Sequence, residues 1–217
     1  FQENTNTYGP VSRLEPLFRA AMEPEDVVAL SVATRPDCLG PDSLAMLARL
    51  RAVKPVWVEL GLQTIHEATA ARIRRGYPLS VFDEAVRDLH AIGVEVIVHL
   101  ILGLPGETAA DMEASSRYVG WCGAEGVKLH LLHILRGTPM AAEYAAGRVR
   151  TLELDEYITI LEQCLAVLPP EAVIHRLTGD APKRDLIAPL WSADKKRVLN
   201  AIRQRFEADE LIQGSKL

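Results

Sequence analysis

The sequence predicts an α/β fold built around a parallel sheet, because short apolar runs alternate with amphipathic stretches along most of the chain. The apolar runs are rich in valine, isoleucine and leucine, as expected of parallel strands that are covered on both faces. Right-handed crossovers between such strands give either a doubly wound sheet or a barrel. We expect strands over residues 27–33, 56–60, 94–102 and 127–132.

Helices are expected next to these strands, where apolar residues recur every three or four positions. They are predicted over residues 14–22, 44–50 and 81–89. Thr64, Ser80 and Thr108 are each followed three residues later by an acidic residue, which predicts capping-box-like helix starts. Gly93 lies where a helix should end before the third strand.

The chain after residue 150 has a different pattern. An amphipathic helix is expected over residues 153–168, a further strand over 172–176, and a helix with a solvated, highly charged face over 193–206. We therefore expect a main unit over residues 1–150 and a C-terminal extension over 151–217 that packs on it.

Composition excludes several classes of protein. The 217 residues include 48% hydrophobic and 24% charged residues, which is typical of a globular domain. The formal net charge of −5 argues against nonspecific binding to nucleic acid or to an anionic membrane surface. There is no secretory signal pattern and no apolar run near the roughly 18 residues of a membrane span, so we expect a cytoplasmic protein. Cys38, Cys122 and Cys164 form no metal-binding motif, so no metal ligands are assigned.

Polar or glycine-rich segments follow each predicted strand, and binding sites of parallel α/β folds lie at these strand ends. The segments cover residues 34–38, 59–64, 103–108 and 133–138. Because strand side chains alternate between faces, Glu59 and His99 share their strand faces with apolar residues, as do Lys128 and His130. Such groups are costly inside strands unless they are paired or used, so we expect a site at this rim. Two structural interpretations stay open: His99 as a hydrogen-bonded core residue, and Glu59 as a partner of Lys128.

Several of these segments, taken together, resemble the radical S-adenosylmethionine (SAM) superfamily, and more narrowly its YhcC/YtqA-like proteins. The similarity runs nearly from end to end. It is carried by TRPDC (residues 34–38), ELGLQT (59–64), RG (75–76), HLILGLPGE (99–107), VKLHLLH (127–133), GT (137–138), HR (175–176), APLW (188–191) and QG (213–214). The resemblance implies a partial (β/α)6 TIM-like barrel of the radical SAM type with a C-terminal helical extension.

The resemblance also implies a cofactor pair, SAM and a [4Fe-4S] cluster. The cluster would donate an electron to SAM, and the resulting 5′-deoxyadenosyl radical would abstract hydrogen from a substrate that the sequence does not identify. A flavodoxin- or ferredoxin-type protein is implied as electron donor. The family's CxxxCxxC loop is absent from this sequence. We expect it upstream of Phe1, together with the first strand and helix of the barrel, and we expect the chain alone to be inactive.

Cofactor-binding roles follow from the resemblance, position by position. Gln63 matches the residue that contacts the SAM ribose, and Arg75 matches the residue that pairs with the methionine carboxylate. Asn4 falls where the family binds the methionine amino group, although the usual Gly-Gly-Glu-type motif is absent. The positions expected beside adenine are Leu102, Gly103, Leu104 and Leu132.

Four residues are expected at the polar, substrate-facing end of the site: Asp37, Glu59, His99 and His130. Two other functions are weighed against the radical SAM enzyme. One is a noncatalytic barrel that binds SAM or a partner. The other is a lyase or aldolase in which Lys128 forms a Schiff base with the substrate.

Overall fold

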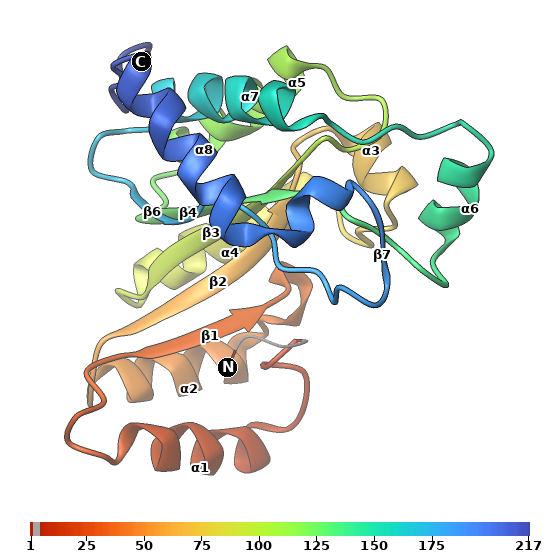
Figure 1. Cartoon of the computed structure of the whole chain (residues 1–217). Coiled ribbons are helices and arrows are strands. Elements are labelled where there is room, and N and C mark those ends of the chain that lie inside the picture. Colours follow the sequence, from red (N-terminus) through yellow and green to blue (C-terminus); the bar gives the residue numbers. More distant parts are fainter. Residues whose placement is uncertain (2–4) are drawn as a thin grey trace.

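The computed structural model describes residues 1 and 5–217, and its centre is a parallel sheet with helices packed along it (Figure 1). The strands are hydrogen-bonded in the order β1-β2-β3-β4-β6, and all four pairings are parallel. The carboxyl ends of the strands therefore meet at one edge of the sheet. The strands are β1 (Leu30–Thr34), β2 (Val56–Gln63), β3 (Glu95–Leu102), β4 (Gly126–Leu131) and β6 (Val173–Arg176).

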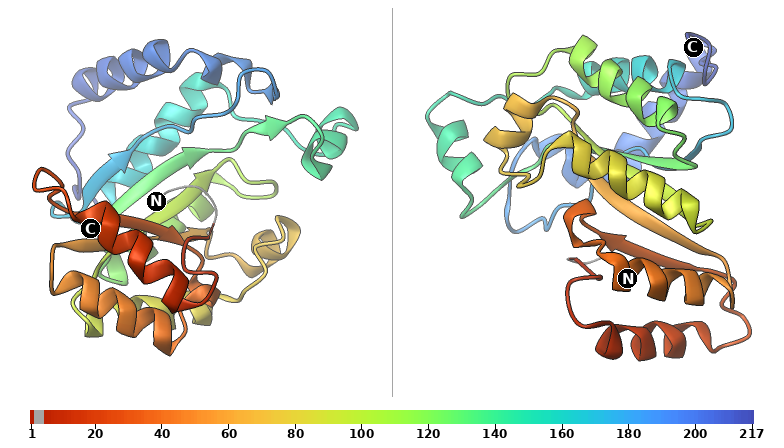
Figure 2. Two further views of the ribbon diagram at one scale, coloured as in Figure 1. Left: turned by 90° about the horizontal axis from the view of Figure 1, so that it is seen from below. Right: turned by 180° about the vertical axis from the view of Figure 1, so that it is seen from behind.

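The helices divide into groups along the sheet. Helices α1 and α2 pack together beside β1, whereas α7 packs between α5 and α8. Figure 2 shows the α1–α2 pair and the α7–α8 pair on opposite sides of the molecule. The helices are α1 (Val11–Met22), α2 (Pro41–Arg51), α3 (Glu67–Arg72), α4 (Leu79–Ala91), α5 (Ala109–Trp121), α6 (Pro139–Ala145), α7 (Leu154–Ala166) and α8 (Lys195–Ala208), with 3-10 turns η1 (Pro36–Cys38) and η2 (Leu190–Ala193).

In the hydrophobic core, every second residue of the strands packs against the inward faces of the helices. Val58, Val98 and Leu129 are fully buried in it, one from each of three adjacent strands. The intervening strand residues face the opposite side of the sheet, and they include Glu59, which is 2% exposed. This alternation is what places polar groups in the interior of the curved sheet.

The predicted strands are confirmed, with shifted ends. β1 begins at Leu30 instead of residue 27, because the Val27 N–H bonds to the Pro24 carbonyl in a turn and Val28 is 77% exposed. β2 continues to Gln63, three residues beyond its expected end. Residues 173–176 join the same sheet as its last strand, parallel to β4.

The predicted helix signals are partly right. Thr108 forms a complete capping box with Asp111 at the start of α5, and Gly93 adopts a φ of 71° after α4. The predicted starts at Thr64 and Ser80 are wrong. His66 precedes the first turn of α3 and Pro78 that of α4, while the Thr64 hydroxyl donates to Glu107.

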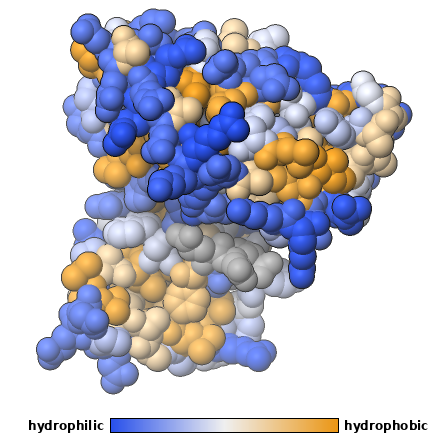
Figure 3. All heavy atoms as spheres, in the orientation of Figure 1, coloured by the Kyte–Doolittle hydropathy of each residue, from blue (hydrophilic) through white to orange (hydrophobic). Residues whose placement is uncertain are grey.

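Helix α8 bears out the expected charged, solvated face. Its buried residues are Val198 and Ile202, and Figure 3 shows mostly hydrophilic surface over this helix. Two pairings were not anticipated from the sequence. The short strands β5 (Ile134–Leu135) and β7 (Leu186–Ala188) form an antiparallel pair. In addition, the backbone of Phe1 bonds to Ser31 and Ala33 along the outer edge of β1.

Candidate functional site

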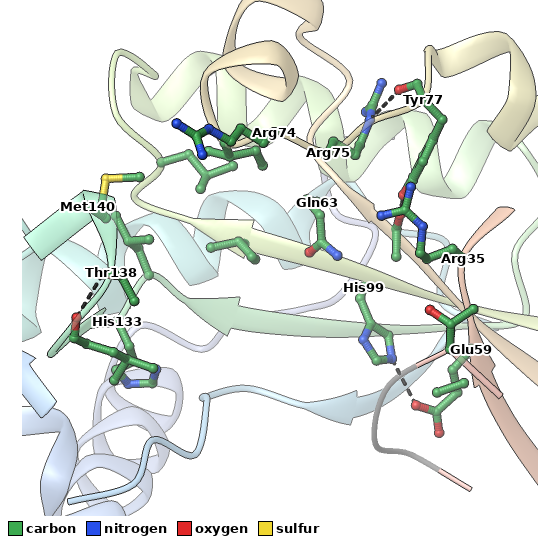
Figure 4. A pocket seen from close by; sticks show the side chains of 18 of the residues that line it. Arg35, Glu59, Gln63, Arg74, Arg75, Tyr77, His99, His133, Thr138 and Met140 are labelled. Carbon is green, nitrogen blue, oxygen red and sulfur yellow. Dashed lines mark hydrogen bonds and ion pairs between the residues drawn. The ribbon is translucent and has the colours of Figure 1, made fainter. Parts of the chain in front are cut away.

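A cavity of about 500 Å³ opens at the carboxyl ends of β1, β2, β3 and β4 (Figure 4). One wall is apolar and is formed by Ile73, Ile101, Leu104, Leu132, Leu135 and Met140. The other parts are polar and include Arg35, Glu59, Gln63, Arg74, Arg75, Tyr77 and His99. The cavity therefore combines a flat apolar surface with hydrogen-bonding groups, as small-molecule sites commonly do.

The structure brings many of the sequence-predicted residues together at this cavity. Its lining includes Glu59, Gln63, Arg75, His99, Leu104 and Leu132. Four others are near the same strand ends but outside the lining: Asp37, Leu102, Gly103 and His130. Asn4 lies outside the described residues.

The deepest part of the cavity is a buried ionic cluster around Glu59. Its carboxylate accepts hydrogen bonds from Lys128 Nζ at 2.5 Å and from His99 Nε2 at 2.9 Å. A third bond comes from the Ser31 hydroxyl at 2.8 Å. Burial alone would raise the pKa of Glu59, but these hydrogen bonds hold it well below its usual range. The cluster is thus a fixed carboxylate whose lone pairs are already engaged.

His130 lies two residues after Lys128 on β4 and differs from this cluster in its hydrogen bonding. Its ring centroid is 5.1 Å from that of His99. Among the described residues its buried Nε2 atom has no hydrogen-bond partner. Burial, and then the nearby His99, lower the pKa of His130 to about 3, so the imidazole is neutral at physiological pH.

Gln63 occupies a strained position at the end of β2. Its φ of 68° lies in the left-handed region, and the β2–β3 register shifts between Gly61 and Gln63. A Cβ atom on Gly61 would come within 2.6 Å of the Gln63 amide nitrogen, so a side chain at this position would require the Gln63 amide to shift from its place in the cavity (Figure 4). Strained non-glycine residues cluster at functional sites, which favours a ligand-contacting role for Gln63.

The Arg75 guanidinium is largely committed to the protein itself. It donates to the carbonyl oxygens of Leu62, Thr64 and Tyr77 and forms an ion pair with Glu67 at 3.2 Å. These bonds hold the segment between β2 and α4 in place, and the Arg75 side chain is only 1% exposed. Arg75 therefore has little hydrogen-bonding capacity left for a ligand carboxylate.

Two further guanidinium groups in the lining were not selected from the sequence. Arg74 has a φ of 58° and its side chain makes no ion pair within the described residues. Arg35 follows β1 and pairs with Asp37 at 2.7 Å. In the sequence, Arg35 stands beside Asp37 in the post-strand segment. Arg74 belongs to a small basic cluster with Arg72 and Arg75 that follows a site loop, and such clusters are usually solvent-exposed.

Gly103, directly after β3, faces Leu152 and lies outside the cavity lining. Gly103 has a φ of 84°, and a Cβ atom there would lie 3.0 Å from Leu152 side-chain atoms. The Leu132 N–H bonds to the Leu102 carbonyl at 2.9 Å, which ties the third and fourth strand ends together. Leu104 and Leu132 then present apolar surface to the cavity.

The described residues do not fit an iron–sulfur cluster. No group of three histidine, cysteine or acidic side chains among them is arranged to hold a metal ion. Cys38 follows β1, Cys122 follows α5 and Cys164 is buried in α7, so the three thiols belong to separate parts of the fold. Within the same residues, no helix has both the length and the apolar composition to cross a membrane.

Comparison with known proteins gives a consistent assignment. The family model described as "Radical SAM superfamily" matches residues 11–119, and "Radical_SAM C-terminal domain" matches residues 124–208. The chain is 42% identical to YtqA of Bacillus subtilis over 99% of its length and 35% identical to YhcC of Escherichia coli over 100%. It spans 66% and 70% of those two proteins, or about two thirds of their length.

A solved structure supports the same fold. The archaeal Methanocaldococcus infernus Elp3 with an N-terminal deletion superposes with a TM-score of 0.76 at 21% identity. The match covers 86% of this chain and 43% of that protein. At this level of identity the similarity concerns the fold, and it agrees with the barrel-like arrangement expected from the sequence.

Proposed function

The chain belongs to the radical SAM superfamily, and from this premise we propose that it forms the SAM-binding and substrate-facing part of an enzyme that abstracts hydrogen from its substrate. Members of the superfamily are enzymes that use SAM together with a [4Fe-4S] cluster. The observation that carries the proposal is the cavity itself, which combines an apolar wall with several guanidinium groups and with Gln63, whose backbone has a left-handed φ.

The residues present fit SAM as a ligand. The apolar wall, including Leu104 and Leu132, offers a surface for adenine, and the Gln63 amide offers both a donor and an acceptor to the ribose hydroxyls. The positive-φ turn at Gly103 carries the backbone between Leu102 and Leu104 along that wall. We also assign Asn4 to the methionine amino group, as the family resemblance implies. The Arg75 guanidinium is bonded to backbone carbonyl oxygens and to Glu67, so we do not assign to it the methionine carboxylate that the same resemblance implies.

When bound, SAM and a reduced cluster supply a carbon-centred radical that removes a hydrogen atom from the substrate. The residues of this chain hold and orient the two reactants and limit access of water. Glu59 keeps His99 in a fixed orientation through a direct hydrogen bond, and Lys128 donates to the same carboxylate. His130 lies just outside the cavity lining and has a buried ring nitrogen without a hydrogen-bond partner among the described residues. We assign Glu59, His99 and His130 to the substrate end of the cavity, and Asp37 to the same end through its ion pair with Arg35.

The cluster requires ligands other than the three cysteines of this chain, because they are not near one another. We propose that these ligands come from a protein segment outside this sequence, and that a flavodoxin- or ferredoxin-type protein delivers the electron. We also propose that residues 1–217 alone do not cleave SAM.

The test uses the full-length protein with a reconstituted cluster, dithionite and SAM. Release of 5′-deoxyadenosine and methionine, measured by chromatography, is the expected result. Gln63→Ala should lower the yield at subsaturating SAM, whereas Arg49→Gln, on the distant α2, should not. Binding of SAM without any 5′-deoxyadenosine would instead establish a noncatalytic SAM-binding barrel.

A Schiff-base reaction at Lys128 has less structural support. The Lys128 ammonium is 2.5 Å from the Glu59 carboxylate, and an amine must lose its proton before it attacks a carbonyl carbon. Borohydride trapping of a substrate on Lys128 is the outcome that would favour a lyase or aldolase over the radical enzyme.

A further inference from the structure

Arg35 is held at the cavity by a bidentate pair with a neighbouring carboxylate. Its Nε donates to Asp37 Oδ1 at 2.9 Å and its Nη2 donates to Asp37 Oδ2 at 2.7 Å. Asp37 lies in the turn η1 directly after β1 and is outside the cavity lining, whereas Arg35 is part of that lining. Asp37 is therefore placed to orient the guanidinium instead of meeting a ligand itself.

A second contact fixes the plane of the same guanidinium. Its Cζ atom lies 5.2 Å from the centroid of the Tyr77 ring, a distance at which a cation is attracted to an aromatic face. The Tyr77 hydroxyl donates to the Gly61 carbonyl, which anchors the ring to β2. Gly76 makes room for this arrangement, since a Cβ atom there would lie 3.1 Å from Arg35 Nη2.

The clamped guanidinium keeps hydrogen-bonding capacity. Arginine has five N–H donors, and the Asp37 carboxylate engages the Nε edge of Arg35. The Nη1 edge is left for a ligand, and Figure 4 shows the guanidinium in front of Tyr77 at the border of the cavity. A preoriented guanidinium matches the planar oxygen pair of a carboxylate or phosphate group.

The charge of the cavity favours the same class of ligand. Its lining contains Arg35, Arg74 and Arg75, and Glu59 is its one carboxylate among the described residues. That carboxylate is already paired with Lys128. Arg35 and Arg75 are also paired, with Asp37 and Glu67 outside the lining, so Arg74 contributes the one positive charge in excess among the described residues of the lining.

We propose that Arg35 is an anion-binding residue of this cavity, that Asp37 and Tyr77 are its positioning residues, and that it receives a carboxylate or phosphate group of a bound ligand. The inference rests on the proposed function, because the ligand is taken to be either SAM or the substrate beside it. Both sources present the same chemistry to Arg35, and they are separated by experiment.

The test compares binding of three probes to the full-length protein by calorimetry. S-adenosylhomocysteine carries a carboxylate, 5′-methylthioadenosine has the same nucleoside without it, and inorganic phosphate represents an anionic substrate group. The variants are Arg35→Gln, Asp37→Asn and the conservative Asp37→Glu. Arg49→Gln is the matched control, because Arg49 forms a similar bidentate pair with Glu15 away from the cavity.

If Arg35 receives the SAM carboxylate, Arg35→Gln weakens S-adenosylhomocysteine binding about tenfold or more and leaves 5′-methylthioadenosine binding unchanged. If it receives a substrate anion, both nucleosides bind normally and phosphate binding measured with bound S-adenosylhomocysteine is lost. In either case Asp37→Asn gives a smaller loss for the same anionic probe, and Asp37→Glu restores part of it. A general destabilisation would weaken all three probes alike.

Two results would count against this assignment in different ways. Wild-type protein that binds neither nucleoside overturns the proposed function and this inference with it. Wild-type protein that binds both nucleosides, with Arg35→Gln equal to wild type for every probe, leaves the proposed function standing and overturns the role of Arg35.

Discussion

The depth and the border of the cavity use charged residues in opposite ways. In the depth, Glu59 is 2% exposed and its carboxylate is engaged by Lys128, His99 and Ser31. At the border, Arg74 has no ion pair within the described residues and Arg35 is paired on one edge only. The charged groups in the depth hydrogen-bond to one another, whereas the arginines at the border keep N–H donors for a ligand.

The backbone is also regular in the depth of the cavity and strained at its border. Glu59 lies in the regular part of its strand, where the pairing with β1 and β3 is continuous. Gln63 and Arg74, at the border, both have φ values in the left-handed region. Regular, fully bonded structure is typical of parts that stabilise a fold, and strain is typical of parts that bind ligands. We therefore expect substitutions in the depth to act on stability and substitutions at the border to act on binding.

The largest effect is expected from Glu59→Gln. It leaves the Lys128 ammonium buried without a counter-ion, which should lower the free energy of unfolding by about 3–5 kcal/mol. Urea denaturation measures the change. Adding Lys128→Met should recover much of the loss, because the unpaired charge is then removed.

Glu15→Gln is the control for this variant, since Glu15 pairs with Arg49 on the surface between α1 and α2. Removing this carboxylate should have little effect, because its partners Arg19 and Arg49 are about half exposed and stay solvated without it. Equal loss of stability in Glu15→Gln and Glu59→Gln would contradict the view that the depth of the cavity is a stabilising ionic cluster.

A smaller, pH-dependent effect is expected from His130. Its pKa is about 3 in the folded protein and about 6.5 in an unfolded chain, so between these values the unfolded state binds more protons. The free energy of unfolding should therefore fall as pH decreases through this window, by about 2 kcal/mol between pH 7 and pH 5 for this group. His130→Gln should remove that part of the loss, measured by urea denaturation at both pH values. Parallel pH dependence in the variant and the wild type would refute the assignment of a buried, neutral imidazole.

Much of the fold follows from patterns that are local in sequence. Strands β2, β3 and β4 are short apolar runs in the sequence. The alternation of side chains along them places Glu59 and His99 on the same face of the sheet, where they are hydrogen-bonded. A helix start is predicted wrongly where a contact between residues far apart in the sequence determines the local structure. Thr64 resembles a helix cap, but its hydroxyl is taken by Glu107, which lies 43 residues further along the chain.

The sequence predicts that the site lies at the strand ends, but it does not predict which arginine side chains are available to a ligand. The position of Arg75 after the β2 loop suggests a ligand contact, but its guanidinium bonds to the carbonyl oxygens of Leu62 and Thr64. Arg74, its neighbour, lines the cavity without such bonds. Arg75 is 5% exposed, whereas Arg74, which has the left-handed φ, is exposed at the cavity. Single-residue backbone reversals carry little sequence signal outside glycine and asparagine, so the sequence does not show which of the two arginines is buried.

The smallest expected effect has the opposite sign from the first. Arg74→Gly relieves the left-handed backbone of a residue with a Cβ atom, so the free energy of unfolding should rise by about 0.5–1 kcal/mol while binding of S-adenosylhomocysteine weakens. Arg72→Gly is the control: Arg72 is the last residue of α3 and pairs with Glu143, so glycine there should lower stability through helix propensity and the lost ion pair. Urea denaturation measures the free energy of unfolding of the two variants, and calorimetry measures their binding of S-adenosylhomocysteine. If Arg74→Gly is destabilised as much as Arg72→Gly, the Arg74 side chain stabilises the fold, and the contrast between a structural depth and a ligand-binding border does not hold.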